Sequence, residues 1–292
     1  MLKPSTPFLV AFMMLFLFIA CKKGDHNGPV PGKDTCMAEI VEVNYYNRDP
    51  GAPPLYADRG YQFKKTFKPD GSISQLYINT PGPYYREHVN GLVVKTGNSL
   101  FLLDSLTKDT AFRATFDANG RVVSSYLAKA YTYEDSPPYT YTYNDKGQLA
   151  SITYYTNVST MLYYDNYGDV NLTSRKVGDS DENTFYSIVY DYSVPVKGAV
   201  YDLRIFSLQP QILEALGYFD LSPRYKVKYT ASDGEGPNSV KTFFDQQINA
   251  AGYLTDYKSS VQWDIEDYPI DTFITHISWH CTKVKKNKLK SN

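Results

Sequence analysis

A short pattern ending in glycine and an aliphatic residue recurs along the chain and constrains its fold more than any other feature. Each copy has an aromatic or aliphatic residue, a few polar or small residues, a glycine, any residue and an aliphatic residue. The five copies span residues 67–73, 116–122, 143–149, 164–170 and 248–254, and the last is the weakest match. Their glycines are Gly71, Gly120, Gly147, Gly168 and Gly252.

This pattern predicts a β-hairpin. Asp or Asn favours the opening of a type I turn, and glycine takes the left-handed conformation at its end, which costs other residues more. The flanking segments alternate in polarity and are rich in β-formers, as in residues 139–143, 225–229 and 273–277. The glycines are 49, 27, 21 and 84 residues apart, close to whole numbers of a two-strand unit of 21 to 27 residues.

We therefore predict an all-β fold in which hairpins form one large antiparallel meander of about a dozen or more strands. An open sheet of this size tends to curl or close, so we expect a barrel-like shell. One short helix is indicated over residues 210–217, where Pro210 lies near the start and Gly217 at the end. This segment is expected to be a packing insert.

The repeated sequence Tyr-x-Tyr-Asn/Asp-x-x-Gly-x-Leu/Val is similar to the YD (Rhs-type) repeat, whose hairpins wind into shells. It also resembles repeats in bacterial envelope lipoproteins described as having a porin-like fold and no known function. The resemblance covers most of residues 35–282 and implies no activity. Because the spacing is less regular than in true YD arrays, a compact curled or closed sheet is favoured over a long spiral.

The N-terminal residues predict export and lipid attachment. Lys3 precedes an apolar run over residues 8–20, and Cys21 and a polar stretch follow at once. The run is too short for a bilayer-spanning helix, which needs about 20 residues, so a cleaved signal peptide is expected. Residues 18–21 resemble a lipobox, in which the cysteine is diacylated. A lipobox usually has leucine at the position of Phe18. The alternative is therefore an ordinary signal peptide that is cleaved without lipid attachment.

These features divide the chain into four parts. We predict a signal peptide over 1–20, a lipidated flexible tether over 21–34, a single all-β domain over 35–282 and a basic tail over 283–292. An aspartate directly after the lipid-bearing cysteine resembles a signal for retention in the inner membrane, and this chain has Lys22 at that position. We therefore expect the outer membrane, either on its periplasmic side or at the cell surface. The tail is expected to be solvated, with contact to anionic lipid or glycan as the alternative.

The two cysteines that remain, Cys36 and Cys281, lie near the two ends of the predicted domain. Exported proteins meet an oxidising environment, and a pair of cysteines suits a disulfide better than a metal site, which needs more ligands. In the chain-entropy model, closing so long a loop contributes on the order of 5 kcal/mol. Two unrelated buried thiols are the alternative.

The sequence gives little support for catalysis. His276 and His280 stand about 13 Å apart on an extended strand, too far to share a metal ion. Asp264 and Glu266 could face the same side of a strand as paired acids for glycan hydrolysis. The sequence has no nucleophile elbow, Walker loop, dinucleotide fingerprint or His-Glu-x-x-His motif. We therefore expect no metal and no cofactor, and an enzyme is the minority interpretation.

Composition narrows the class of partner. The 30 Lys and Arg residues nearly balance the 31 Asp and Glu residues, so bulk attraction to nucleic acid is not expected. Tyrosine is enriched, at 28 of 292 residues. Its ring and hydroxyl suit stacking on sugars or contact with a protein, and they equally suit cross-strand packing within the repeat.

We therefore predict a non-enzymatic envelope lipoprotein that binds a ligand, a glycan or a protein at an aromatic-rich surface. The alternatives are a structural component of an envelope assembly and, less favoured, a glycan hydrolase that uses surface carboxylates. Asp104-Ser105-Leu106 and Asp109-Thr110-Ala111 resemble an O-glycosylation signal of some Gram-negative envelope proteins. Whether either triplet is modified is a question for intact-mass measurement of the native protein.

Overall fold

The five glycine turns have the backbone that the sequence predicts. In the computed structural model of the chain, their glycines have φ values between 76° and 91°, in the left-handed region that favours glycine. Each glycine donates its N–H to a carbonyl three residues earlier, as Gly147 does to Asn144 at 2.8 Å. The first and last residues of every copy are cross-strand partners: Phe67 and Ile73, Phe116 and Val122, Tyr143 and Leu149, Tyr164 and Val170, and Ile248 and Leu254.

An Asp or Asn side chain caps four of these turns. Asn144, for example, accepts the backbone N–H groups of Lys146 and Gln148 through its Oδ1 atom. Asp117, Asp165 and Asn249 accept equivalent pairs of N–H groups in their own turns. The first turn differs because Lys68 stands at this position, and there the Asp70 carboxylate accepts the N–H and hydroxyl of Ser72 instead.

The structure describes residues 35–46, 61–81, 86–131, 137–154, 157–179, 183–195, 208–219, 225–231, 239–264 and 270–282. All of them belong to one compact unit, which spans Gly32–Asn292. Within these ranges, no helix has the length and apolarity needed to cross a bilayer.

The described residues form sixteen strands and two short helical segments. The strands are β1 (Thr35–Tyr46), β2 (Tyr61–Phe67), β3 (Ile73–Pro81), β4 (Arg86–Thr96), β5 (Ser99–Asp104), β6 (Thr110–Phe116), β7 (Val122–Leu127), β8 (Tyr139–Tyr143), β9 (Leu149–Tyr154), β10 (Val158–Tyr164), β11 (Val170–Val177), β12 (Asn183–Pro195), β13 (Tyr225–Ala231), β14 (Ser239–Ile248), β15 (Leu254–Trp263) and β16 (Asp271–Thr282). The helical segments are the 3-10 turn η2 (Lys129–Tyr131) and the α-helix α2 (Leu208–Ala215).

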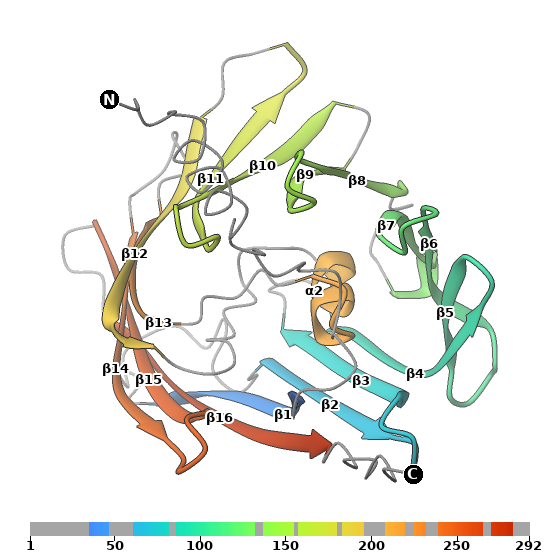
Figure 1. Cartoon of the computed structure of the whole chain (residues 1–292), viewed down its shortest axis with the longest axis horizontal. Coiled ribbons are helices and arrows are strands. Elements are labelled where there is room, and N and C mark those ends of the chain that lie inside the picture. The colour runs from blue at the N-terminus through green and yellow to red at the C-terminus, as the bar shows by residue number, and fades with distance from the viewer. Residues whose placement is uncertain are drawn as a thin grey trace, which may run out of the picture. The chain divides into compact units, whose positions relative to one another are not determined.

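Every strand pairs antiparallel with its neighbours in sequence, and β1 pairs with β16, so the order of strands closes into a barrel. Figure 1 shows the resulting ring of strands around α2. The all-β meander of hairpins with one short helix, predicted from the repeated turns, is therefore confirmed. The β1–β16 ladder runs from Thr35 opposite Thr282 to Tyr46 opposite Thr272, with one irregularity between Ala38 and Ile40.

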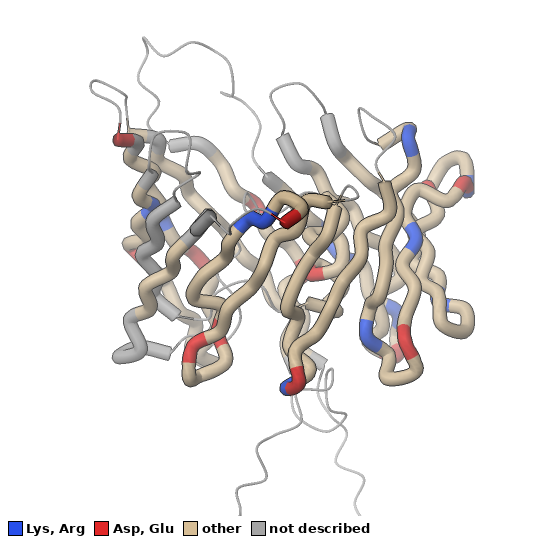
Figure 2. The backbone as a smooth tube through the Cα atoms, turned by 90° about the horizontal axis from the view of Figure 1, so that it is seen from above, with Lys and Arg blue, Asp and Glu red and all other residues tan. Residues whose placement is uncertain are grey.

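Connections in such a meander alternate between the two ends of the barrel. All five glycine turns follow even-numbered strands and therefore lie at one end, together with the start of β1 and the end of β16. We call this end the glycine rim and the opposite end the loop rim. Figure 2 shows acidic and basic residues at several of the turns where neighbouring strands reverse.

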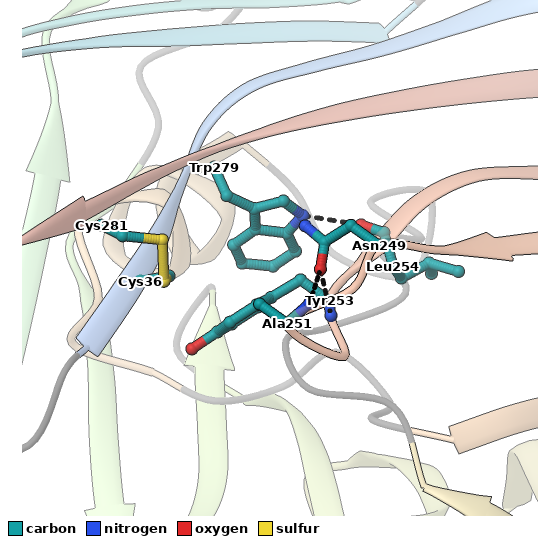
Figure 3. The surroundings of a disulfide bond; sticks show 7 residues. All are labelled: Cys36, Asn249, Ala251, Tyr253, Leu254, Trp279 and Cys281. Atoms are coloured by element: carbon teal, nitrogen blue, oxygen red, sulfur yellow. Dashed lines mark hydrogen bonds between the residues drawn. A yellow bond between two sulfur atoms is a disulfide. The ribbon is translucent and has the colours of Figure 1, made fainter.

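A disulfide joins the first and last strands at the glycine rim. Cys36 and Cys281 are direct cross-strand partners, and their sulfurs are bonded across a sequence separation of 245 residues. The predicted disulfide is therefore confirmed. Trp279, two residues before Cys281, donates its indole N–H to the Leu254 carbonyl at 2.6 Å, so the fifth glycine turn lies beside the closure (Figure 3).

The Trp279 bond belongs to a set that links successive hairpins. Tyr143 donates its hydroxyl hydrogen to the carbonyl of Val122 at 2.8 Å, and Tyr164 donates to that of Leu149 at 2.7 Å. Tyr190 does the same to Val170. In all four bonds the acceptor is the aliphatic residue that ends a glycine repeat, so we call them the inter-hairpin bonds. Tyr143 and Tyr164, which begin two of the repeats, use their hydroxyl groups in this way, whereas a phenylalanine ring could pack there but could not donate.

We predict that replacing Tyr164 with Phe lowers the free energy of unfolding by about 1 kcal/mol or more, because the partly buried Leu149 carbonyl loses its donor. Urea denaturation measures the change. The control is Tyr126→Phe, which removes a hydroxyl from a ring that is 39% exposed and should change stability by less than about 0.5 kcal/mol. Equal losses in the two variants would contradict a special role for the inter-hairpin bonds.

Candidate functional site

The inner face of the barrel is a packed apolar core. Val41, Phe63, Leu76, Ile78 and Leu102 come from four different strands, and each has 0% of its surface exposed. They belong to one cluster of buried residues that continues around the wall and includes residues of α2. Strand alternation produces this arrangement, because every second side chain of each strand points inward.

The helix α2 is placed within this core by its ends. Gly217 has φ of 82° and donates its N–H to the Glu214 carbonyl, while Tyr218 donates to the Leu213 carbonyl at 2.9 Å. These two bonds are those of a Schellman motif, which ends a helix at a left-handed glycine. The helix hint at Pro210 and Gly217 is thus correct, and all eight residues of α2 are buried.

Polar contacts fix α2 to separate parts of the wall. On β2, the Lys65 ammonium donates to the Ala215 carbonyl at the end of the helix, at 2.7 Å. On β7, the Ser125 hydroxyl donates to Gln209 Oε1 at 2.7 Å and also bonds the Tyr141 hydroxyl of β8. The helix therefore acts as a strut inside the barrel, between β2 and the junction of β7 with β8.

Lys65 is the most unusual residue of this interior. It has only 2% of its surface exposed, and burial lowers its pKa to about 7, while the nearby Glu214 carboxylate favours the charged form. The lysine stands on the apolar face of its strand, two residues after Phe63, so strand alternation alone could have identified it as a buried cation. Because its nitrogen is used by the end of α2, we assign this cluster to holding the strut.

The outer face of β4–β10 has a different chemistry. One hydroxyl residue from each of these seven strands is the cross-strand partner of the next, which gives a continuous row across the wall. The row consists of Thr96, Ser99, Thr115, Ser124, Thr140, Thr153 and Ser159. Thr115 and Ser124 share a hydrogen bond, as do Thr153 and Ser159, while Thr96 and Thr140 are exposed.

A second row lies one step nearer the loop rim. It runs from Val94 through Phe101 and Arg113 to Tyr126, again as direct cross-strand partners. Tyr126 is 39% exposed, Val94 is 37% exposed and Arg113 is also exposed. We call the two rows together the hydroxyl face. It offers neutral hydrogen-bonding groups, two aromatic rings and a single charge on the outer wall of the barrel.

Most other tyrosines whose side chains the structure describes are buried or half-buried. Tyr139, Tyr141 and Tyr257 are buried, and Tyr143 and Tyr164 are half-buried in inter-hairpin bonds. Burial raises the pKa of Tyr143 to about 12, with the Arg121 guanidinium opposing part of this shift. Among the tyrosines that the structure describes, packing is therefore the commoner use, as the alternative interpretation predicted.

The two histidines considered as metal ligands make separate contacts. His276 bonds Asp256 on the neighbouring strand, whereas His280 stacks on Phe67 with ring centroids 4.1 Å apart. Across the part of the chain that the structure describes, no group of three or more His, Cys, Asp or Glu is arranged to hold a metal ion. Asp264 is exposed, and Glu266 lies outside the described residues, so the structure does not test that pair.

The first of the two serine and threonine triplets has a structural role. The Asp104 carboxylate accepts the N–H groups of Leu106 and Thr107 and the Tyr131 hydroxyl. The Tyr131 bond is the main reason why the pKa of Asp104 falls to about 2. Ser105 is half-buried and Thr110 is exposed, both at the loop rim. Glycosylation of either residue stays a prediction.

The comparisons with known proteins concern the fold. A porin-like protein from Bacteroides uniformis has a similar structure. The TM-score is 0.56 at 14% sequence identity, over 82% of this chain and 98% of that protein. At this identity the likeness extends to the fold alone, and it agrees with the predicted porin-like architecture.

Two larger assemblies are also similar over part of their length. They are a TcdB2-TccC3-TEV structure and a Photorhabdus luminescens Tc holotoxin pore, with TM-scores of 0.31 and 0.26 and identities of 10% and 8%. The matches cover 73% and 74% of this chain but 9% and 12% of those chains, and at these scores they carry no argument. No family model matches the chain, and no curated protein matches it.

We predict that the stability of the wild-type protein relative to a Lys65→Met variant rises with pH. The unfolded lysine, with a pKa of 10.5, holds its proton over a range in which the buried lysine, with a pKa of about 7, has lost it. Folding therefore releases a proton between these values, and stability rises as pH rises through this window. The difference between the two proteins should grow by roughly 2 kcal/mol from pH 7 to 9 and stay flat below the folded pKa.

Urea denaturation of both proteins across this range measures the effect, and taking the difference removes the contribution of the other titrating groups. A Lys64→Met variant is the matched control, because Lys64 neighbours Lys65 in sequence but is exposed. If the difference in the free energy of unfolding between the wild-type protein and Lys65→Met does not change with pH, Lys65 is not a buried lysine with a lowered pKa.

Proposed function

We propose that this protein is a lipid-anchored envelope protein whose hydroxyl face binds a glycan. The observation that carries the proposal is the row of seven cross-strand hydroxyl residues beside Phe101, Arg113 and Tyr126. Tyrosine provides a broad apolar ring with a polar tip, suited to stacking on a sugar ring. Hydroxyl and guanidinium groups exchange hydrogen bonds with sugar hydroxyls, and strands hold them in fixed positions at a spacing of about 4.8 Å.

The lipid anchor is part of this proposal. The apolar run over 8–20 and the Phe-Ile-Ala-Cys sequence at 18–21 support cleavage before Cys21 and acylation of its sulfur. Both features lie outside the described residues. The Cys36–Cys281 disulfide supports an oxidising compartment. The repeated hairpins support the assignment of these segments to the YD type of repeat. The proposed location is the outer membrane, on either face.

The distribution of polarity supports an anchor rather than insertion of the wall into a membrane. Transmembrane barrels place apolar residues outward and polar residues inward. Here Phe63 and Leu76 point into a packed core, whereas Lys64, Thr66 and Arg113 are exposed on the outside. A wall of this kind suits water on its outer face.

A structural role in an envelope assembly is the second candidate. Exposed apolar side chains at or near the loop rim favour it, since Leu106 is 89% exposed, Ile270 is 53% exposed and Val177 is 42% exposed. Such residues suit contact with a protein partner. Co-purification of envelope proteins, lost on Leu106→Ser and kept in variants of the hydroxyl face, would favour this role. A glycan hydrolase would instead release products from a bound glycan.

We predict that Cys21→Ser prevents lipid attachment. The wild-type protein made in a Gram-negative host should incorporate labelled palmitate and fractionate with membranes, and the variant should do neither. Intact-mass measurement of the wild-type protein should give a chain that begins at Cys21 and carries acyl groups. Palmitate incorporation that persists in the variant would contradict the assignment of Cys21.

We predict that Tyr126→Ala and the pair Thr140→Val with Thr153→Val each weaken glycan binding by about tenfold or more, because each removes ring contact or hydroxyl groups from the same face. Binding to an array of envelope and plant polysaccharides measures the effect, followed by titration with the best ligand. The matched control is Thr66→Val, which removes an exposed hydroxyl from the outer face of β2. Binding that survives changes on the hydroxyl face, or that Thr66→Val weakens equally, would contradict this proposal.

A further inference from the structure

Phe101, Arg113 and Tyr126 follow one another in the second row of the hydroxyl face. They come from β5, β6 and β7, which lie side by side in the wall (Figure 1), and each is the direct cross-strand partner of the next. The arginine therefore stands between the two aromatic residues. Since neighbouring strands are about 4.8 Å apart, the two rings are separated by about 10 Å along the row.

All three side chains project from the outside of the barrel. The residues before and after Phe101 are Leu100 and Leu102, which are 2% and 0% exposed, so strand alternation turns the Phe101 ring outward. Phe101 itself is half-buried, whereas Tyr126 and Arg113 are exposed. A molecule that lies across the strands can therefore contact all three residues at once.

Arg113 brings a positive charge that this part of the wall does not neutralise. The only acidic residue of β5, β6 and β7 is Asp104, whose carboxylate accepts the Tyr131 hydroxyl and two backbone N–H groups. Arg121, by contrast, has its own partner in Asp117. Over the ranges that the structure describes, Arg113 forms no ion pair. The row thus offers one guanidinium to an acidic ligand.

A linear glycan with equatorial linkages matches the spacing of this row. Its successive pyranose rings are turned over relative to one another, so the same ring face recurs at every second sugar, at a distance close to two strand spacings. Aromatic rings stack on the apolar face of a sugar. Two sugars stacked on Phe101 and Tyr126 place the sugar between them over Arg113, and a carboxylate there would accept a bidentate, charge-assisted hydrogen bond.

We propose that the hydroxyl face binds a linear acidic glycan in which a uronic acid occupies every second position. This inference rests on the proposed function and specifies the class of glycan. The glycan lies across β5–β7, with neutral sugars on Phe101 and Tyr126 and the uronic acid on Arg113. On each of these strands, one hydroxyl residue of the first row stands two positions away, at about 7 Å, and can bond the edge of the same sugar.

Isothermal titration calorimetry of the whole protein with two probes tests this. Hyaluronan oligosaccharides alternate glucuronic acid with N-acetylglucosamine, and chitin oligosaccharides of equal length contain N-acetylglucosamine alone. We expect the hyaluronan oligosaccharides to bind at least about tenfold more tightly at low salt and to lose this advantage at high salt. Of the two hyaluronan trisaccharides, the one with glucuronic acid in the middle should bind more tightly.

Three variants locate the effect. Arg113→Gln should weaken hyaluronan binding by about tenfold or more and chitin binding by a much smaller factor, because glutamine keeps hydrogen-bonding groups but carries no charge. Phe101→Ala should weaken binding of both probes. The matched control is Arg175→Gln, which removes an exposed arginine from β11 and should change neither. Thermal melting shows that each variant is folded.

The possible failures of this inference and of the proposed function are distinguishable. Equal binding of the two probes, weakened in both cases by Phe101→Ala, would overturn the uronic acid assignment and leave glycan binding in place. A preference for hyaluronan that Arg113→Gln does not reduce would overturn it as well. If neither probe binds, the inference is wrong, and the polysaccharide array decides separately whether the hydroxyl face binds a glycan.

Discussion

The left-handed glycine at the corner of each repeated turn is the constraint on which the rest of the structure depends. It lets a side chain-capped type I turn reverse the strand so that the first and last residues of the pattern face each other, as Tyr143 and Leu149 do. This register in turn brings the aromatic residue of one hairpin within reach of the preceding hairpin. The inter-hairpin bonds, such as that from Tyr164 to the Leu149 carbonyl, then join neighbouring units through side chains as well as backbone.

These side-chain contacts matter most where the backbone ladder is short. The β7–β8 ladder consists of two residue pairs, Ser124 with Thr140 and Ser125 with Tyr139, whereas the ladder between β1 and β16 has eleven. Tyr143 spans the short ladder at the glycine rim, and Ser125 spans it inside the barrel while also holding α2. The strut is thus attached where the wall has least backbone pairing, which gives the buried polar groups of the interior a structural reason.

Much of this architecture could be predicted from the sequence because it depends on patterns of neighbouring residues. The turn glycines, the Asp and Asn caps, the alternation of the strands and the Pro210–Gly217 helix each depend on residues close together in the chain. The pairing of Cys36 with Cys281 followed from their positions near the domain ends. The location of α2 inside the barrel could not be predicted in this way, because it depends on Lys65 and Ser125, which are distant in sequence.

The hydroxyl face shows the same limit. Alternation within residues 139–143 predicts that Thr140 and Thr142 share one side of a strand, but the alignment of Thr140 with Ser124 and Thr153 needs the register of three strands. The tyrosine count was equally ambiguous. It suited either a binding surface or packing within the sheet, and the hydrogen bonds of Tyr143, Tyr164 and Tyr190 show that these three tyrosines join neighbouring hairpins.

Backbone pairing between β1 and β16 closes the barrel, and the disulfide reinforces this closure. Hydrogen exchange of the backbone amides in a Cys36→Ser, Cys281→Ser variant tests this most directly, with β3 and β4 as the internal reference. The structure predicts that amides near the middle of β1 and β16, around Val41 and Ile277, exchange about as slowly as those of β3 and β4. Fast exchange of the amides that β1 and β16 donate to each other, with β3 and β4 still protected, would show that in the wild-type protein only the disulfide joins the two end strands of an open sheet.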